Sequence, residues 1–225
     1  MRNGSIAERL TAVRAAVSEA AGEAGRAESE ITTIVVTKFH PASLVRELAA
    51  LGVRDFGENR HQEAAGKAAE VADLDLVWHF VGQLQSKKAR QARAYARVVH
   101  SLDRESVIDA LASPEAVVDG FVQLNLTDDP SRGGVQPEDL TRIAERVIAA
   151  EGLRLLGVMA VAPIGEEPRK AFERVRAASD RLKALDPGAR FISAGMSGDF
   201  REAILEGATH LRIGSAITGN RPAPG

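Results

Sequence analysis

The chain has 225 residues, a length typical of one α/β barrel or of two small domains, and we expect a single domain over residues 1–225. Its 29 basic and 31 acidic residues give a formal net charge of -2, so the total charge predicts no nucleic acid partner. The sequence contains no cysteine, which excludes disulfides, thiolate metal ligands and a cysteine nucleophile. We expect neither a membrane span nor a signal peptide, and therefore a cytoplasmic protein.

A helix is predicted near the start of the chain. Ser5 and Glu8 have the spacing of a capping box, in which each side chain binds the backbone N–H of the other residue. Apolar residues then recur three or four positions apart, which predicts a helix that buries one face: Ile6, Leu10, Val13 and Val17.

Short apolar runs alternate with amphipathic helical patterns along the rest of the chain. Each helical pattern is long enough to carry the chain from one strand to a parallel neighbour. This alternation predicts an α/β fold, a (β/α)8 TIM barrel with one extra N-terminal helix, and it leaves a doubly wound open sheet as the alternative. The eight predicted strands are residues 31–37, 53–56, 76–81, 97–100, 120–126, 153–161, 190–194 and 209–213.

Lys38 directly follows the first predicted strand, residues 31–37. In a barrel of this kind the working residues gather at the C-terminal ends of the strands. A lysine amine at such a place is a natural nucleophile for an aldehyde, because desolvation or neighbouring cations favour its neutral form. The alternative is a lysine that has simply left the strand and entered a loop.

Two loops near the end of the chain have the composition of a phosphate site. The segments 194–199 and 212–216 begin at the ends of the seventh and eighth predicted strands. Asp199 with Glu202 is expected to form a capping box that opens a helix. Glycine and serine at a helix start offer free N–H groups to an anion, and these two loops often hold phosphate in barrels. The alternative is a pair of ordinary turns and caps. The residues expected to hold a phosphate are Ser197, Gly198, Gly214 and Ser215.

An amine nucleophile beside a phosphate site points to pyridoxal phosphate (PLP), whose aldehyde would form a Schiff base with Lys38. Arg212 lies near the end of the eighth predicted strand and is expected to face the pyridine nitrogen. A permanently charged guanidinium there discourages protonation of that nitrogen, so the ring becomes a weak electron sink. The alternative for Arg212 is a salt-bridged arginine of the barrel.

Five sequence strings occur in order over nearly the whole chain: Thr37-Lys38, Phe56-Gly57-Glu58-Asn59-Arg60, Trp78-His79-Phe80-Val81-Gly82-Gln83-Leu84-Gln85-Ser86, Gly195-Met196-Ser197-Gly198-Asp199 and Arg212-Ile213-Gly214-Ser215-Ala216. Together they resemble those of the pyridoxal phosphate homeostasis proteins, the YggS/PROSC family. The resemblance implies a fold-type III barrel similar to the N-terminal domain of alanine racemase, with PLP on Lys38. It also implies a protein without established catalytic turnover that hands PLP on to PLP-requiring acceptor enzymes and so affects vitamin B6 and amino-acid balance.

Two further residues are candidate cofactor contacts. Asn59 follows the second strand, as in the family pattern, and its alternative role is a helix cap. His79 lies on the third strand, and its alternative role is a satisfied group of the core. We expect no catalytic residue and no metal ligand. The complete set expected to bind PLP is Lys38, Asn59, His79, Met196, Ser197, Gly198, Arg212, Gly214 and Ser215.

The basic residues between positions 87 and 97 are expected to form a solvated helical face, with an acidic partner or a second phosphate-bearing ligand as the alternative. In this region the chain departs from the family pattern, with Lys87 where relatives commonly have asparagine. Residues 222–225 are expected to form a short frayed tail.

Two other functions remain open. A PLP-dependent amino-acid racemase needs a second base on the opposite face of the cofactor, and the single tyrosine, Tyr95, lies in a predicted helix after the third strand. A barrel enzyme acting on a sugar phosphate would use the same lysine and the same phosphate site, because a fold does not fix its chemistry. We expect a protein that is not an enzyme, and a monomer, since the sequence shows no second domain and no apolar seam.

Overall fold

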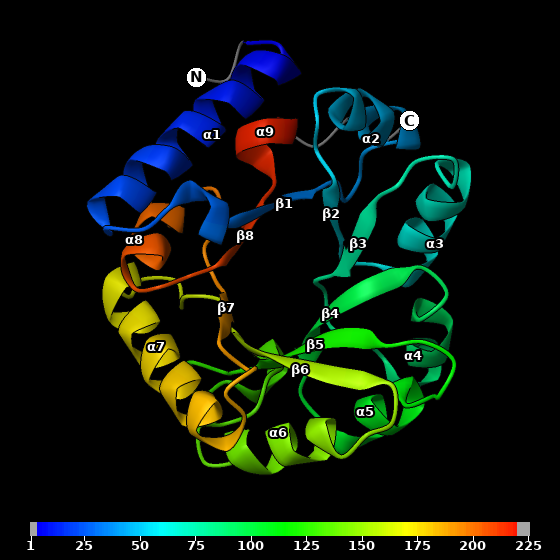
Figure 1. Ribbon diagram of the computed structural model, residues 1–225, viewed down its shortest axis with the longest axis vertical. Coiled ribbons are helices and arrows are strands. Elements are labelled where there is room, and N and C mark those ends of the chain that lie inside the picture. The colour runs from blue at the N-terminus through cyan, green and yellow to red at the C-terminus, as the bar shows by residue number, and fades with distance from the viewer. Residues whose placement is uncertain (1–3, 220–225) are drawn as a thin grey trace.

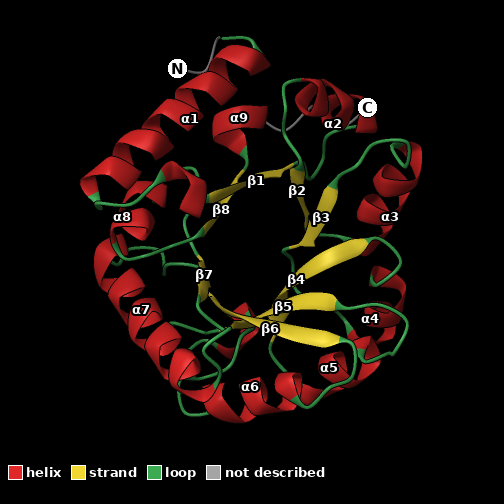
Figure 2. Ribbon diagram, viewed as in Figure 1, coloured by secondary structure: helices red, strands yellow, loops and turns green. Residues whose placement is uncertain are grey.

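The computed structural model describes residues 4–219, which form a closed barrel of eight parallel strands surrounded by helices (Figures 1 and 2). The strands follow one another around the barrel in chain order, and β1 pairs with β8 to close it. This confirms the predicted (β/α)8 barrel and excludes the open sheet. The predicted tail at residues 222–225 lies outside the described residues.

Each of the eight strands overlaps its predicted run. The largest difference is in the run 120–126, because the fifth strand ends at Gln123. The backbone beyond it turns to its own loop, where Asn125 N donates to the carbonyl of Val135 at 2.8 Å. The strands are β1 (Thr32–Val36), β2 (Asp55–Glu58), β3 (Val77–Phe80), β4 (Ala96–Leu102), β5 (Val118–Gln123), β6 (Leu153–Met159), β7 (Phe191–Ser193) and β8 (His210–Ile213).

The helices lie outside the barrel and bury their apolar faces against the strands (Figure 2). Leu48 and Phe172, for example, are buried in the layer between the helices and the sheet. No helix within residues 4–219 is long and apolar enough to cross a membrane. The α-helices are α1 (Ile6–Glu23), α2 (Ala42–Ala50), α3 (His61–Glu70), α4 (Ser86–Ala92), α5 (Glu105–Leu111), α6 (Leu140–Ile148), α7 (Pro168–Leu185), α8 (Phe200–Leu205) and α9 (Ser215–Thr218), and two short 3-10 turns are η1 (Glu28–Glu30) and η2 (Pro130–Arg132).

The predicted capping box of α1 is confirmed. Glu8 N donates to Ser5 Oγ at 3.2 Å, and Ser5 N donates to a carboxylate oxygen of Glu8 at 2.7 Å. The helix packs against α8 and α9 (Figure 1), and Arg9 Nε donates to the carbonyl of Ile217 at 2.7 Å. The extra helix therefore covers the part of the barrel where β8 meets β1. Its buried residues include Ile6, Leu10, Val13 and Val17, as predicted.

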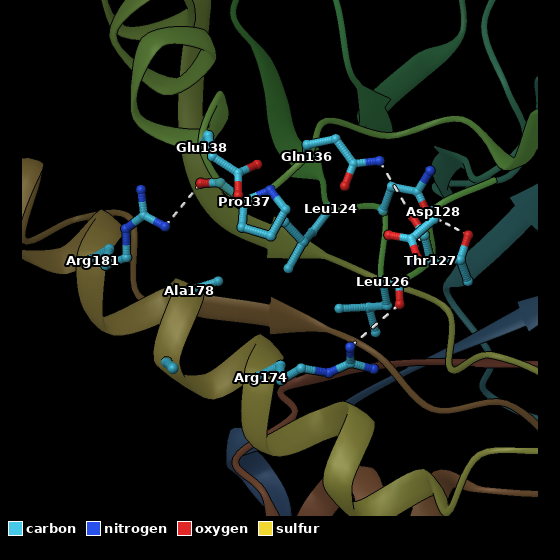
Figure 3. A pocket seen from close by; sticks show the side chains of 12 residues that line it. Leu124, Leu126, Thr127, Asp128, Gln136, Pro137, Glu138, Arg174, Ala178 and Arg181 are labelled. Carbon is cyan, nitrogen blue, oxygen red and sulfur yellow. Dashed lines mark hydrogen bonds between the residues drawn. The ribbon is translucent and has the colours of Figure 1, made fainter. Parts of the chain in front are cut away.

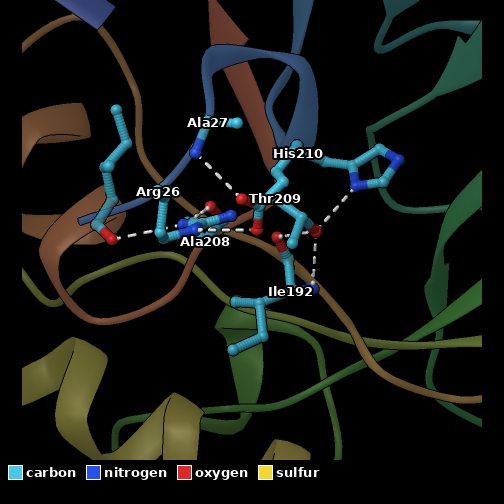
Figure 4. Close-up of polar contacts among 8 residues, drawn as sticks. Arg26, Ala27, Ile192, Ala208, Thr209 and His210 are labelled. Carbon is cyan, nitrogen blue, oxygen red and sulfur yellow. Dashed lines mark hydrogen bonds and ion pairs between the residues drawn. The ribbon is translucent and has the colours of Figure 1, made fainter. Parts of the chain in front are cut away.

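Side-chain hydrogen bonds support the seam between β7 and β8. β7 is three residues long, and its Ile192 N–H donates to Thr209 Oγ1 at 2.9 Å rather than to a strand carbonyl (Figure 4). Arg26 Nη1 donates to the carbonyl of Ala208 at 2.7 Å, which fixes the chain just before β8. The seam thus depends on one hydroxyl and one guanidinium as well as on the backbone.

Replacing Thr209 with valine is expected to lower the free energy of unfolding by about 1–2 kcal/mol, because the N–H of Ile192 loses its acceptor at nearly constant side-chain volume. Urea unfolding measures the loss. The control is Thr11→Val at an exposed position of α1, which should change the free energy by less than about 0.5 kcal/mol. Equal effects of the two substitutions would contradict this account of the seam.

Candidate functional site

The loops that follow β7 and β8 touch each other at the C-terminal end of the barrel. Ser197, in the loop after β7, accepts through Oγ a hydrogen bond from the N–H of Ala216 at 3.2 Å. The loop after β8 also lies beside β1, since a Cβ at Gly214 would stand 3.7 Å from the Cβ of Val36. The ends of β7, β8 and β1 therefore define one site.

Free backbone N–H groups converge at this site. In the described part of the chain, the N–H groups of four residues in the two loops have no hydrogen-bond partner: Ser197, Gly198, Gly214 and Ser215. Gly198 is exposed, and a Cβ there would meet no atom within 4 Å, so the loop leaves space at that point. Clustered N–H donors of this kind fit an anion with several acceptor oxygens, such as a phosphate group.

The expected capping box of Asp199 with Glu202 is wrong. Asp199 is the N-cap residue of α8, but its side chain accepts no hydrogen bond from that helix. Its Oδ1 instead accepts from the N–H of Met196 at 2.6 Å, so the carboxylate closes its own loop. Burial raises the pKa of this carboxyl group. Asp199 therefore shapes the loop that carries two of the free N–H groups.

Only one of the two serines opens a helix, which also differs from the prediction. Ser215 is the first residue of α9, a helix of four residues with Gly214 as its N-cap. Ser197 and Gly198 instead lie in the turn before the N-cap of α8. The N–H groups available to an anion are therefore exposed mainly by the shape of the loops rather than by the starts of helices.

Lys38 lies in the turn after β1, and its side chain is exposed. Strand pairing continues one residue beyond β1, where Thr37 N donates to the carbonyl of Gly57 at 3.1 Å. Within residues 4–219 the ammonium of Lys38 makes no hydrogen bond or ion pair, and it lies 6.0 Å from the centre of the Phe39 ring. Lys38 has therefore left the strand and entered a loop, as the alternative interpretation of the sequence predicted. Its amine nevertheless stands accessible at the same end of the barrel as the free N–H groups.

A buried charged cluster lies beneath this turn, and sequence reasoning missed it. Lys67 Nζ, on α3, donates to the carbonyl of Thr37, to Glu58 Oε1 and to Glu63 Oε1, each at 2.7 Å. Thr37 Oγ1 also donates to Glu58 Oε1 at 2.7 Å. We call these four residues, Thr37, Glu58, Glu63 and Lys67, the Lys67 cluster. Burial raises the pKa of Glu58, and the hydrogen bonds from Lys67 and Thr37 oppose that rise.

The Lys67 cluster holds the backbone on both sides of Lys38. It binds Thr37 before the lysine, and Glu63 accepts the N–H of Phe39 after it. Phe39 has a φ of 70°, a left-handed conformation that is uncommon for residues other than glycine. The pair Glu63 and Lys67 was visible in the sequence at helical spacing, but such pairs are usually exposed and carry no signal of burial.

Arg212 is buried at the end of β8 and donates to neutral acceptors. Its Nη1 donates to Ser193 Oγ at 2.6 Å and its Nη2 to the carbonyl of Ala160 at 2.9 Å. No salt bridge to Arg212 exists within residues 4–219, so the alternative of a salt-bridged arginine is wrong. Burial lowers its pKa to about 10, and the nearby carboxylate of Asp199 opposes the change, so the guanidinium is charged at neutral pH.

His79 and Asn59 occupy different surroundings. His79 is buried, with Nε2 3.0 Å from Asp55 Oδ1 and Nδ1 2.9 Å from His100 Nε2. It is therefore a hydrogen-bonded group of the core, as the alternative interpretation predicted. A direct contact with the cofactor stays a prediction. Asn59 follows β2, and the N-cap of α3 is Arg60, so the cap alternative for Asn59 is wrong. Asn59 lines a polar pocket of about 230 Å³ between the ends of β2 and β3.

The basic residues between positions 87 and 97 do not share one helical face. The helix α4 ends at Ala92, and Arg97 lies on β4 with an exposed side chain. Arg93 is structural, since its guanidinium donates to the carbonyls of Leu111 and Ala116 in the neighbouring segment. Lys87 is exposed.

A pocket of about 420 Å³ lies away from the predicted site, between the loop after β5 and α7 (Figure 3). Its two arginines are engaged with backbone carbonyls, Arg174 with Leu126 at 3.4 Å and Arg181 with Pro137 at 2.9 Å. None of the residues predicted to bind the cofactor lines it. The candidate site is therefore the group of loops around Lys38 and Ser197, and this pocket is separate from it.

The chain matches the family model of the alanine racemase N-terminal domain over residues 9–222. It is 42% identical over 224 residues to the pyridoxal phosphate homeostasis protein of Pseudomonas aeruginosa, covering 96% of this chain and 96% of that protein. It is 36% identical over 226 residues to the protein of the same name from Escherichia coli, covering 96% of this chain and 97% of that protein.

Solved structures have the same architecture. PipY of Synechococcus elongatus, solved with PLP bound, has a TM-score of 0.83 and 34% identity, covering 96% of this chain and 100% of PipY. Alanine racemase of Corynebacterium glutamicum shares the fold with a TM-score of 0.71 at 16% identity, and the match covers 98% of this chain and 61% of the racemase. The chain therefore belongs to the pyridoxal phosphate homeostasis protein family, whose barrel is that of the alanine racemase N-terminal domain.

Proposed function

We propose that this chain holds PLP as a Schiff base on Lys38 and takes part in vitamin B6 and amino-acid homeostasis without catalytic turnover. The observation that carries the proposal is the presence, at one end of the barrel, of an accessible lysine amine and four unpartnered backbone N–H groups. Two relatives support it. The Pseudomonas aeruginosa protein is named for PLP homeostasis, and PipY was solved with PLP bound.

The two loops after β7 and β8 would hold the phosphate group. Their free N–H groups supply donors at Ser197, Gly198, Gly214 and Ser215. The hydroxyl of Ser197 accepts from Ala216, so its own hydrogen stays available for a phosphate oxygen. Asp199 keeps the first loop in this shape through its bond to the N–H of Met196.

Lys38 would hold the aldehyde end of the cofactor. When bound, PLP supplies an aldehyde that reacts reversibly with a primary amine. The Lys67 cluster fixes the backbone around Lys38, so the lysine side chain begins from a rigid turn. The exposure of Lys38 leaves the cofactor accessible to a competing amine or to a PLP-requiring acceptor enzyme, which is what release requires.

Arg212 would face the pyridine nitrogen of the cofactor. Its pKa of about 10 keeps the guanidinium charged at neutral pH, and a fixed cation there opposes protonation of the ring nitrogen. The ring is then a weak electron sink, which agrees with binding and release rather than with carbanion chemistry. We propose Asn59, His79 and Met196 as further residues around the cofactor.

Racemase chemistry is disfavoured by the state of Tyr95. Its hydroxyl lies 3.3 Å from His61 Nδ1, and the two rings stack with centroids 5.8 Å apart. Burial raises the pKa of Tyr95, and the charge of Glu58 raises it further. A phenol with a raised pKa stays protonated at neutral pH and cannot accept a proton, so Tyr95 is not suited to be the second base of a racemase.

We also propose that the protein works as a cytoplasmic monomer. A single barrel accounts for the described residues, and the family relatives match this chain over nearly their full length. Sedimentation equilibrium with and without PLP tests the monomer, and a dimer mass would overturn it.

Lys38→Ala is the variant that tests the proposed function. Titrated with PLP, the wild-type protein should develop the visible absorbance of a Schiff base, and Lys38→Ala should lack it while retaining weaker binding that inorganic phosphate displaces. Lys87→Ala, an exposed lysine of α4, is the control and should behave as wild type. The same absorbance in Lys38→Ala and wild type would refute the assignment of Lys38.

A further inference from the structure

The barrel interior contains a continuous line of hydrogen bonds, here called the interior network, through Asp55, His79, His100, Ser193 and Arg212. From one end to the other the bonds measure 3.0 Å between Asp55 and His79, 2.9 Å between the two histidines, 2.8 Å from His100 to Ser193 and 2.6 Å from Ser193 to Arg212. Because β4 and β7 are not neighbouring strands, the bond between His100 and Ser193 crosses the inside of the barrel.

The interior network connects the two ends of the barrel. Asp55 is the first residue of β2, so it lies at the N-terminal end, and its side chain is 30% exposed. Ser193 is the last residue of β7, and Arg212 lies near the end of β8, at the side of the candidate site. The four residues after Asp55 are buried, with at most 5% exposure. A solvent-facing carboxylate is thereby linked to the arginine beside the site.

The donors of this network run in one direction. Arg212 can only donate, so Ser193 Oγ accepts from it and has its own hydrogen for His100 Nδ1. His100 then carries its proton on Nε2 and donates to His79 Nδ1, and His79 Nε2–H donates to the carboxylate of Asp55. The opposite direction, with both histidines neutral, would place a bare ring nitrogen against that carboxylate.

Burial keeps two histidines of the barrel interior, His100 and His210, neutral at neutral pH. Burial lowers the pKa of His100 well below its usual value, and the nearby His79, Arg212 and His210 add to that effect. The ring of His100 stacks on Phe121 with centroids 4.7 Å apart, which leaves little room for water. Burial also lowers the pKa of His210 to about 4, so this neighbour brings no positive charge at neutral pH.

We propose that Asp55, His79 and His100 are positioning residues that fix the guanidinium of Arg212 beside the cofactor, acting through the hydroxyl of Ser193. The network commits the hydrogen of Ser193 to His100, which leaves the oxygen of Ser193 as a full acceptor for Arg212. Asp55, at the far end of the barrel, sets the tautomer of both histidines. The proposal rests on the proposed function, since it concerns how Arg212 is held for PLP.

Nitrogen-15 NMR of the histidine rings in cofactor-free wild-type protein tests the network without PLP. At pH 7.5 the spectrum should show His79 and His100 as neutral rings with the proton on Nε2 in both. A proton on Nδ1 of either ring, or a doubly protonated ring, would overturn the proposal. This measurement needs no variant, so it does not depend on a substituted protein folding correctly.

PLP affinity tests the consequence for Arg212. Asp55→Leu should lower the affinity about tenfold and disturb the tautomers of both histidines, whereas Asp55→Asn keeps an acceptor and should stay within threefold of wild type. The matched control is His210→Phe, an interior histidine outside the network, which should also stay within threefold. Wild-type affinity in Asp55→Leu would overturn the positioning role. If wild-type protein bound no PLP, the proposed function would fail, and the ring spectrum would still decide the network.

Discussion

Replacing Gly198 with aspartate is expected to weaken PLP binding by about 100-fold without unfolding the protein. A Cβ at Gly198 meets no atom within 4 Å and the backbone φ there is not in the left-handed region, so the substitution fits the fold. The new carboxylate would lie among the N–H groups proposed to hold the phosphate. Two unit charges about 6 Å apart at an effective dielectric constant of about 20 repel by about 3 kcal/mol, which corresponds to the expected loss.

The matched control is Gly198→Asn, which has the shape of aspartate without its charge. Absorbance or fluorescence titration with PLP should place its affinity within about tenfold of wild type, and urea unfolding should give the same stability for both variants. If aspartate and asparagine at position 198 bound PLP equally well, the phosphate would lie elsewhere.

Replacing Lys67 with methionine is expected to cost about 3–5 kcal/mol of stability. The side chains of Lys67 and Glu58 are 6% and 1% exposed and 2.7 Å apart, and removing one partner of a buried ion pair leaves the other charge unpaired. The loss should be partly recovered in the double variant Lys67→Met with Glu58→Gln, because the buried charge is then removed as well. Urea unfolding of the three proteins measures both effects, and a loss below about 1 kcal/mol in the single variant would contradict the role of the Lys67 cluster.

The defect of Lys67→Met should depend on pH in a defined direction. Burial already raises the pKa of Glu58 above 4.5 in the folded wild-type protein, and the hydrogen bond from Lys67 opposes that rise. Without this hydrogen bond, the pKa of Glu58 in the folded variant should be higher still. The folded state then binds a proton more tightly than the unfolded state does, so stability falls as pH rises through the interval between the two pKa values. The variant should therefore be closer to wild type near pH 5 than near pH 8.

The barrel could be predicted because its strands and helix caps leave local signals. A strand buried on both sides appears as a short apolar run, and residues 76–81 and 209–213 contain β3 and β8. The capping box of Ser5 and Glu8 can be predicted from two residues three positions apart, and the structure contains both of its hydrogen bonds. Asp199 has the same local signal at the start of α8, but its carboxylate binds the loop behind it, and no rule on spacing distinguishes these outcomes.

The charged and polar contacts around the site could not be predicted, because they join distant or ambiguous residues. His100 and Ser193 are 93 positions apart, so only the closed barrel brings them together. Glu58 stands in one of the strings that resemble the family, yet nothing in its neighbours announces that it is fully buried against Lys67. The salt-bridge alternative for Arg212 failed for a similar reason, since neutral acceptors leave no charge pattern in the sequence.

Peptide mapping after borohydride reduction tests the central claim most directly. Protein mixed with one equivalent of PLP and then reduced should carry a single phosphopyridoxyl group, located by mass spectrometry on the peptide that contains Lys38. Pyridoxal, which lacks the phosphate for the loops at Ser197 and Gly214, should label that peptide far less. A label on another lysine, or no label at all, would contradict the assignment of Lys38 as the residue that holds the cofactor.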